Sequence, residues 1–396
     1  MNWANELELL TKSCRGNSRL VAAQGVLVRA CGNYSSLKGW ISAEYECWGT
    51  VADVVMRRGA LSVSGILDSR KYIIFSRQLN QLRKTEGRLF GVPCRKYFIK
   101  DWCLIHSHYR KLMYFISNDK KHIKVLGCSE PAINLSMSCC LNSLIICSMV
   151  RKGGVVFHAA VVKYINSGIL VPGDSGNGKT TIALLLGRRP DFALLANDKC
   201  CLFIKNENLC AYTVPQNVPL GLGLIHALGW GRAIGALAID SQNLHPGNHK
   251  ILINRVCSGN YFPIYRKSGR EYKYHLLAKH LPGVFNVALV NQAEIDSVLI
   301  PTFRPNGSAL GAKRPGAGNQ QGNSALGIRD EEFLELLTVK ERESHEMNSI
   351  KIAAAISEKK SFQIAISKDA QRTEADVYAC VMRNCSDEVK NRDNSI

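Results

Sequence analysis

The chain has 396 residues, of which 46% are hydrophobic and 21% charged, a balance typical of globular proteins that excludes wholesale disorder. Its 51 Lys and Arg residues against 32 Asp and Glu give a formal net charge of +19, which favours anionic partners such as nucleotides and phosphorylated molecules. The basic residues are scattered in pairs, such as Arg57-Arg58 and Lys120-Lys121, which argues against nucleic-acid binding.

The cysteines and the apolar segments indicate where the protein works. The fifteen cysteines include no C-x-x-C pair, and the segment from Met1 lacks the basic and apolar regions of a signal peptide. We therefore expect reduced thiols that fill the core of a cytoplasmic protein. The apolar stretch at 134–150 falls short of the roughly 20 residues of a membrane span. It predicts a buried helix, and we expect no membrane partner.

Residues 1–130 predict a mostly β region of unknown role. The apolar runs at 112–116 and 122–126 flank Asn118-Asp119, where turn-forming residues separate them. That arrangement predicts a β-hairpin.

Residues 131–304 predict an α/β core. After the helix at 134–150, apolar runs alternate with a further helix, a pattern that favours a parallel sheet. In this region we expect strands at 155–164, 168–171, 193–204, 251–256 and 298–302, and a helix at 178–186.

The last part of the chain predicts a linker followed by an extension that completes the core. Residues 305–326 are rich in Gly, Pro, Asn and Ser and predict a flexible linker or loop. Within the extension at 327–396, the pattern predicts helices at 331–337, 348–356 and 370–382, a strand at 362–366, and a tail that frays from Ser386.

One segment carries a complete phosphate-binding motif. It matches G-x-x-x-x-G-K-[ST] between an apolar strand and an apolar helix, and its residues are Gly173, Asp174, Ser175, Gly176, Asn177, Gly178, Lys179, Thr180 and Thr181. Glycines let successive backbone N–H groups turn toward an anion, and the helix N-terminus adds partial positive charge. Lys179 would neutralise the β- and γ-phosphates of ATP, and Thr180 would offer its hydroxyl to Mg²⁺. A glycine-rich turn that fits the motif by chance is the alternative.

Two polar residues stand at apolar strands on either side of this motif. Asp198 closes the strand that includes Leu194-Leu195-Ala196, where a carboxylate either holds Mg²⁺ or accepts the proton of an attacking hydroxyl. A solvated strand-end carboxylate is the alternative. His158 lies in the apolar run from Val155 and is either a satisfied core histidine or a catalytic one.

Taken together, these residues resemble the HPr kinase/phosphorylase-like family, which shares a core with phosphoenolpyruvate carboxykinases. In that family a strand histidine precedes G-x-S-G-x-G-K-[ST]-[ST], and a helix then leads to an Asp-Asp pair. The similarity covers mainly residues 154–204. It implies an α/β fold with a P-loop core of the HPr kinase/PEP carboxykinase-like type, and a mostly β N-terminal region beside it.

The resemblance also implies roles for particular residues. Gly176, Gly178, Lys179, Thr180 and Thr181 would bind ATP, with Mg²⁺ between Thr180 and Asp198, and His158 would lie near the transferred phosphoryl group. Three features depart from the family or lie outside its motif. Asn197 stands where the family has its first Asp, and the amide cannot accept a proton at neutral pH. The family's C-terminal glycine-arginine-asparagine motif is absent, which argues against HPr as the substrate. The segment 214–223 corresponds to the acceptor side in similar relatives.

These observations predict a kinase that transfers the γ-phosphate of ATP to a hydroxyl of a small molecule or peptide, with His158, Lys179 and Asp198 as catalytic residues. A nucleotide-binding regulatory protein of the same fold without transfer activity is the alternative, and a nucleic-acid-associated NTPase is the third. Lys250 and Arg255 are either phosphate contacts or solvated basic residues. The sequence leaves the acceptor open and allows a homo-oligomer.

Overall fold

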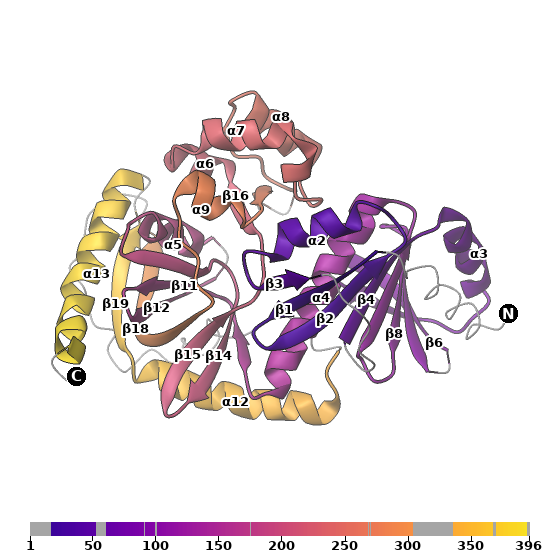
Figure 1. Cartoon of the computed structure of the whole chain (residues 1–396), viewed down its shortest axis with the longest axis horizontal. Coiled ribbons are helices and arrows are strands. Elements are labelled where there is room, and N and C mark those ends of the chain that lie inside the picture. The colour runs from indigo at the N-terminus through magenta and orange to yellow at the C-terminus, as the bar shows by residue number, and fades with distance from the viewer. Residues whose placement is uncertain are drawn as a thin grey trace. The chain divides into compact units, whose positions relative to one another are not determined.

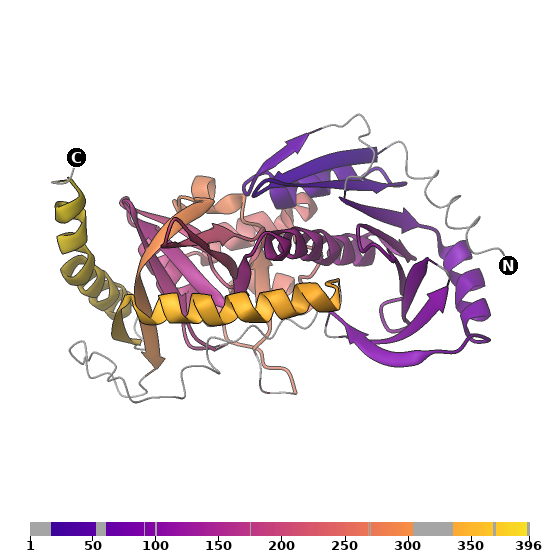
Figure 2. The ribbon, with the colours of Figure 1, turned by 90° about the horizontal axis from the view of Figure 1, so that it is seen from below.

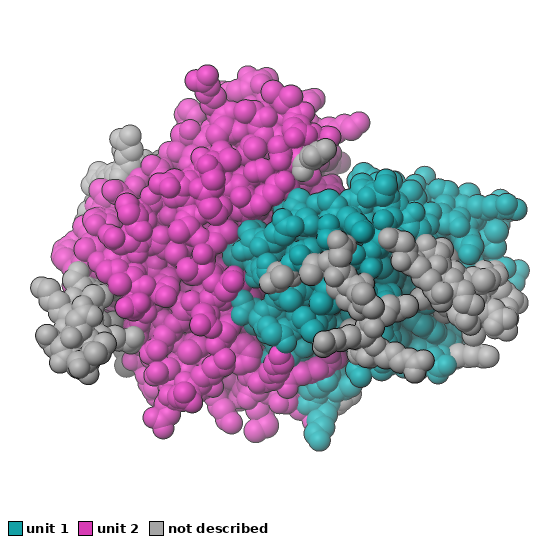
Figure 3. Space-filling model, viewed as in Figure 1, with its two compact units in different colours: residues 1–149, 330–342 teal, residues 150–329, 343–396 magenta. Residues whose placement is uncertain are grey.

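The computed structural model describes residues 17–52, 61–90, 92–99, 101–174, 176–267, 269, 271–303, 336–366 and 370–393. The chain forms two compact units: Met1–Met149 with Asp330–Arg342, and Val150–Arg329 with Glu343–Ile396 (Figure 3). Each unit therefore combines segments that are distant in sequence. The linker expected at 305–326 and most of the helix expected at 331–337 lie outside the described residues. The domain boundaries at 130, 304 and 326 stay predictions.

The first unit is built on a nine-stranded sheet with the order β3-β1-β2-β4-β9-β8-β7-β6-β5 (Figure 1). The pairs β2–β4 and β4–β9 are parallel and the others antiparallel. The predicted hairpin is confirmed as β8–β9. The strands are β1 (Asn17–Ala23), β2 (Val26–Gly32), β3 (Thr50–Ala52), β4 (Leu61–Leu67), β5 (Thr85–Leu89), β6 (Val92–Ile99), β7 (Trp102–Ser107), β8 (Leu112–Ser117) and β9 (His122–Gly127).

Three helices accompany this sheet: α2 (Leu37–Tyr45), α3 (Ser69–Leu79) and α4 (Glu130–Arg151). Helix α3 begins where the Asp68 side chain accepts a hydrogen bond from the Lys71 backbone N–H at 2.8 Å, which satisfies a free helix-end donor. Its buried Tyr72, Phe75 and Leu79 follow a helical spacing and pack into an apolar cluster.

Helix α4 confirms the helix predicted at 134–150. Tyr34, between β2 and α2, donates to Asn134 at 2.7 Å, and Tyr114 of β8 donates to Ser136 at 2.9 Å, so the first unit satisfies two polar side chains of α4. Among the described helices, α4 alone is long and apolar enough to cross a membrane, and 78% of its most apolar window is buried inside the protein. One such helix is weak evidence for a span, because the core helix of a soluble protein has the same length and composition.

The second unit contains an eight-stranded sheet in which β18 is central. The order β10-β14-β15-β18-β12-β11-β13 is extended by β19, which pairs with β18. The start of β18 pairs antiparallel with β15, and its later part pairs parallel with β12 and β19. The sequence pattern favours a parallel sheet, but this sheet is mixed: the pairs of β18 with β12 and β19 are parallel, and the other strand pairs are antiparallel. The strands are β10 (Val155–Phe157), β11 (Ala159–Tyr164), β12 (Ser167–Pro172), β13 (Phe192–Ala196), β14 (Cys200–Lys205), β15 (Asn208–Thr213), β18 (Gln292–Phe303) and β19 (Lys360–Ile366).

Two strands that the sequence predicted as continuous are interrupted. The run 155–164 breaks at His158 into β10 and β11, and the run 193–204 breaks at residues 197–199 into β13 and β14. On one side of the breaks β10 pairs with β14, and on the other β11 pairs with β13. The two runs therefore stay paired with each other across the gap, which lies between the pairs Phe157–Cys200 and Val161–Ala196 and brings His158 and Asp198 together.

The helices of the second unit come from two parts of the chain, before residue 304 and after residue 335. Helix α5 (Lys179–Gly187) follows β12, and α12 (Val339–Ser357) and α13 (Ala370–Asp393) each form one continuous helix (Figure 2). Between them, a two-stranded ribbon of β16 (Val218–Gly221) and β17 (Lys273–Leu276) accompanies short helices. These are α6 (Leu222–Ala227), α7 (Gly231–Ile239), η1 (Ser241–Asn243), α8 (Lys250–Cys257) and α9 (His280–Phe285).

The strand expected at 251–256 is wrong, because this segment forms helix α8. Its buried residues are Leu252 and Val256, four positions apart, as one helix face requires. The ring of His249 accepts a hydrogen bond from the Ile251 N–H at 3.3 Å and so caps the first turn. The helices and the strand expected at 348–356, 362–366 and 370–382 are confirmed, and α13 continues past Ser386 to Asp393.

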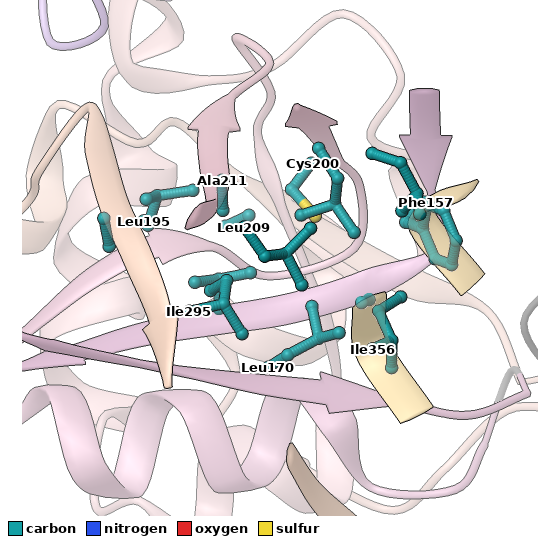
Figure 4. Close-up of a cluster of buried hydrophobic side chains, with 14 of the residues drawn as sticks. Phe157, Leu170, Leu195, Cys200, Leu209, Ala211, Ile295 and Ile356 are labelled. Carbon is teal, nitrogen blue, oxygen red and sulfur yellow. The ribbon is translucent and has the colours of Figure 1, made fainter. Parts of the chain in front are cut away.

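One apolar cluster fixes the sheet of the second unit. Leu170, Leu195 and Ile295 lie in it beside Ile356 of α12, and all four are at most 5% exposed (Figure 4). The second C-terminal helix, α13, contacts α5: its Glu374 forms ion pairs with the two arginines that follow α5, at 3.0 Å to Arg189 and 3.9 Å to Arg188. The C-terminal segment therefore packs against both strand and helix of the central motif.

Gly168 marks the closest approach between β12 and β18. A Cβ at this position would overlap the carbonyl oxygen of Glu294 and lie 3.0 Å from Ile295 Cδ1. The register of the two strands also shifts between Gly168 and Ile169. Only glycine fits here without moving backbone.

We predict that Gly168→Ala lowers the free energy of unfolding by about 1–3 kcal/mol, because the methyl group forces the two strands apart. Urea denaturation followed by circular dichroism measures the change. Gly283→Ala on α9 is the matched control, since a Cβ there meets no atom within 4 Å. Equal losses in the two variants would contradict the explanation.

Candidate functional site

The loop between β12 and α5, residues 173–178, is called the glycine loop below. The fully buried β12 enters it and α5 leaves it. Gly173, Gly176 and Gly178 have φ values of +143°, +95° and +84°, in a region that L side chains rarely adopt. At Gly178 a Cβ would also collide with Ile366 Cδ1. These backbone angles require glycine at the three positions where the motif has it. Ser175 lies outside the described residues.

The start of α5 carries backbone donors without a cap. Gly178 is the N-cap residue and has no side chain to offer, and the first helical bond runs from Ile182 N–H to the Gly178 carbonyl at 2.9 Å. The N–H groups of Lys179, Thr180 and Thr181 precede that bond. They and the helix dipole favour an anion at this end.

Lys179 turns back over the glycine loop. Its ammonium donates to the carbonyl oxygens of Gly173 at 2.5 Å and Asp174 at 2.9 Å, and the residue is only 5% exposed. Burial lowers the pKa of Lys179, and nearby Lys273 lowers it further, while Asp198 and Asp174 act in the opposite direction. The cation is thus held at the mouth of the loop by carbonyl groups that an anionic ligand could replace.

His158 connects Lys179 with Asp198. Its Nε2 lies 3.3 Å from Lys179 Nζ, and its Nδ1 lies 3.4 Å from Asp198 Oδ1. Since an ammonium can only donate, Nε2 accepts a hydrogen bond from Lys179, and a neutral ring then points its Nδ1–H at the carboxylate. The chain of ammonium, imidazole and carboxylate joins residues from three segments.

Thr180 and Asn197 lie on the same side of the loop. The Thr180 hydroxyl donates to the backbone carbonyl of Asn197 at 3.3 Å, which places it at the end of β13 next to Asp198. Asn197 is 1% exposed, and among the described residues neither polar atom of its side chain has a hydrogen-bond partner. A buried amide without partners is costly and is rare in folded proteins.

The predicted site residues divide by exposure. Lys179 is buried, His158, Gly173, Gly178, Thr180, Thr181 and Asp198 are half-buried, and Asp174, Gly176 and Asn177 are exposed. Lys250 and Arg255 both lie on α8, and neither has a hydrogen bond or ion pair with a described residue of the glycine loop.

Oxygen ligands for a metal ion are few. Within the described parts of the chain, no group of three or more His, Cys, Asp or Glu side chains could hold a metal ion. Thr180 and Asp198 supply a hydroxyl and a carboxylate, both oxygen donors of the kind that Mg²⁺ prefers. Mg²⁺ usually keeps several waters and takes one or two protein ligands plus substrate phosphates, so this small set is compatible with it.

Sequence analysis missed the residues that support the strand end at Asp198. The side chain of Gln216 accepts from the Lys199 N–H at 3.3 Å and donates to the Lys199 carbonyl at 2.8 Å. The segment 214–223 is conspicuous in the sequence for its Pro and Gly residues. Its pairing with Lys199, 17 residues earlier, carries no local signal.

Next to Gln216, the amide of Asn217 bridges two histidine rings. It lies 2.9 Å from His245 Nε2 and 2.9 Å from His275 Nδ1. Gly247 N–H donates to His245 Nδ1 at 3.0 Å, and burial lowers the pKa of His245 to about 3. Burial also lowers the pKa of His275 to about 4, with Lys273 and Arg266 adding to the effect. This network fixes the ribbon of β16 and β17 to the segment after β15.

The comparisons with known proteins add little. No protein-family model matches the chain, and no curated protein matches it. Among solved structures, the Hpr(Ser) kinase/phosphatase from Coxiella burnetii is similar at 16% sequence identity and a TM-score of 0.20. The match covers 38% of this chain and 65% of that one, so less than two thirds of that structure's length is represented. A likeness of this size carries no argument about the family, the fold or the activity.

We predict that His245 makes the protein acid-sensitive. An unfolded histidine titrates near pH 6.5, whereas His245 in the folded protein titrates at about 3. Between these values the unfolded chain binds a proton that the folded chain does not, so stability falls as pH falls below about 6.5. His245→Gln should reduce the slope of unfolding free energy against pH by about 1.4 kcal/mol per pH unit between about pH 4 and 6.

Chemical denaturation at a series of pH values measures this slope. Above about pH 7 the His245 ring and the Gln side chain are both uncharged, so the plots of unfolding free energy against pH should run parallel for the two proteins there. A variant whose slope at acid pH equals that of the unchanged protein would rule out this role for His245.

Proposed function

We propose that this chain is an ATP-dependent kinase that transfers the γ-phosphate to a hydroxyl of a small molecule or peptide. The observation that carries the proposal is the position of Lys179. Its ammonium lies within 3.3 Å of two loop carbonyls and of His158, directly at the uncapped start of α5. Cation, helix end and glycine loop together make a site for a polyphosphate.

The glycine loop and α5 would bind the phosphates of ATP. The N–H groups of Lys179, Thr180 and Thr181, which no side chain caps, and the left-handed glycines suit close approach of phosphate oxygens. Lys179 would leave the carbonyl groups of Gly173 and Asp174 and bind the β- and γ-phosphates. Its buried position strengthens this attraction, because the local dielectric is low.

Thr180 and Asp198 would hold Mg²⁺, which supplies charge neutralisation at the β- and γ-phosphates when it is bound. His158 keeps the Asp198 carboxylate oriented through its Nδ1 at 3.4 Å. In the transfer, the acceptor oxygen forms a bond to the γ-phosphorus and the bond to the β,γ-bridging oxygen breaks, leaving ADP. The proton of the acceptor hydroxyl would go to the Asp198 carboxylate if that carboxylate is not bound to Mg²⁺.

A second candidate rests on Asn197. Its amide is buried at the strand end beside Asp198 and offers no carboxylate for proton transfer. This observation favours a nucleotide-binding regulatory protein of the same fold without transfer activity. Both candidates require ATP binding, and only the kinase forms a phosphorylated product.

We predict that Lys179→Ala abolishes binding of Mg-ATP. In the unchanged protein, ATP at about 100 times its dissociation constant should stabilise the fold by about 2.7 kcal/mol. The variant should show no ATP-dependent rise in melting temperature, whereas the exposed Lys351→Ala on α12 should respond like the unchanged protein. Full stabilisation by ATP in the lysine variant would be incompatible with the proposal.

Asp198→Asn separates the two candidates. With labelled ATP and an extract of the source cells, a kinase should label an acceptor, and Asp198→Asn should lower that labelling at least about a hundredfold. The regulatory protein should label nothing in either form, while Asp198→Asn changes only its affinity for Mg-ATP. Labelling that survives the substitution unchanged would remove Asp198 from the mechanism.

A further inference from the structure

Residues 241–270, which lie between β16 and β17, are basic and include no acidic residue. Between Asp240 and Glu271 the sequence contains no Asp or Glu, while Lys250, Arg255, Arg266 and Lys267 all lie there. Lys250, Arg266 and Lys267 are exposed, and none has an ion pair with another described residue. The arginines after α5 differ, because Glu374 neutralises them.

Large apolar side chains are exposed among these cations. Phe262 is 78% exposed, Tyr265 63% and Ile251 43%. Apolar groups of this size in contact with water favour a partner that covers them. With Lys250, Arg266 and Lys267 they form a surface that is called the basic aromatic patch below.

Tyr272 holds the two halves of the patch together. Its ring contacts the His249 ring at a centroid distance of 5.7 Å, and the Arg266 guanidinium lies 4.8 Å from its centroid. His249 directly precedes Lys250 and Ile251 on α8, and Arg266 lies between Tyr265 and Lys267. The nearest acidic residue in the sequence, Glu271, accepts from the Leu222 N–H at 3.1 Å and is therefore engaged with α6. Figure 1 shows α6, α7 and α8 grouped together.

Strand β17 begins next to the patch. Its first residue, Lys273, comes one residue after Tyr272 and helps to lower the pKa of Lys179. A polypeptide bound to the patch would therefore lie next to the strand whose first residue acts on Lys179.

We propose that the basic aromatic patch binds an acidic segment of a polypeptide that carries the acceptor hydroxyl. Three exposed cations that have no ion pair with another described residue attract carboxylates, and three exposed apolar side chains give contact area that a small phosphorylated metabolite would not cover. Polynucleotide sites of known strength use about six to ten phosphate contacts, more than this patch offers. The role of the bound polypeptide as phosphoryl acceptor rests on the proposed kinase activity, whereas its binding to the patch does not.

The test uses the full chain and a short fluorescein-labelled peptide of Asp and Glu with interspersed Leu and a single Ser. Fluorescence anisotropy without nucleotide should detect binding to the unchanged protein that weakens with salt. Arg266→Glu/Lys267→Glu should bind at least about tenfold more weakly, and Phe262→Ser should also lose affinity. The control Lys351→Glu/Lys359→Glu, with the same change of net charge, should stay within about twofold of the unchanged protein. Circular dichroism melts check that each variant folds.

Several outcomes would overturn the proposal. They are absence of peptide binding, equal loss in the control variant, or tighter patch-dependent binding of polyuridylate or of vesicles with anionic lipid. Lys179→Ala distinguishes the two hypotheses. If ATP still raises the melting temperature of Lys179→Ala, the proposed function fails. If this variant still binds the peptide through the patch, the proposal of a docking surface stands whatever the result with ATP.

Discussion

The buried ammonium of Lys179 is the constraint on which the rest of the site depends. A cation that is 5% exposed needs acceptors on every donor, and the protein supplies two loop carbonyls and one imidazole nitrogen. Carbonyls can point at one amine only if the backbone curls, which explains the left-handed glycines. The imidazole can reach it only if a strand opens at His158.

The interruption of the strand at His158 shows why the sequence predicts the presence of strands better than their boundaries. The runs 155–164 and 193–204 have the apolar, β-branched composition of long strands, and most of their residues do lie in strands. Where the ladder between these two runs is interrupted depends on contacts far along the chain, and local composition does not record it. The breaks at His158 and at 197–199 therefore had no sequence signal beyond the polar residues themselves.

The glycine loop was predictable residue by residue, because its motif encodes backbone angles that only glycine adopts at little cost. Two other features were not. Helix α8 contains Ile251, Ile253 and Val256, whose β-branched side chains favour a strand locally, yet packing of Leu252 and Val256 on one face decides for a helix. Gln216 supports the turn after Asp198 across 17 residues, a pairing visible only once the chain has folded.

The tie between α5 and the end of the chain has a consequence for synthesis. Gly178 packs against Ile366, the arginines after α5 bind Glu374, and β19 completes the edge of β18. A ribosome finishes the glycine loop almost two hundred residues before it reaches these partners. Until β19 is made, β18 lacks this neighbour, and an unpaired strand edge of this kind is open to pairing with other chains.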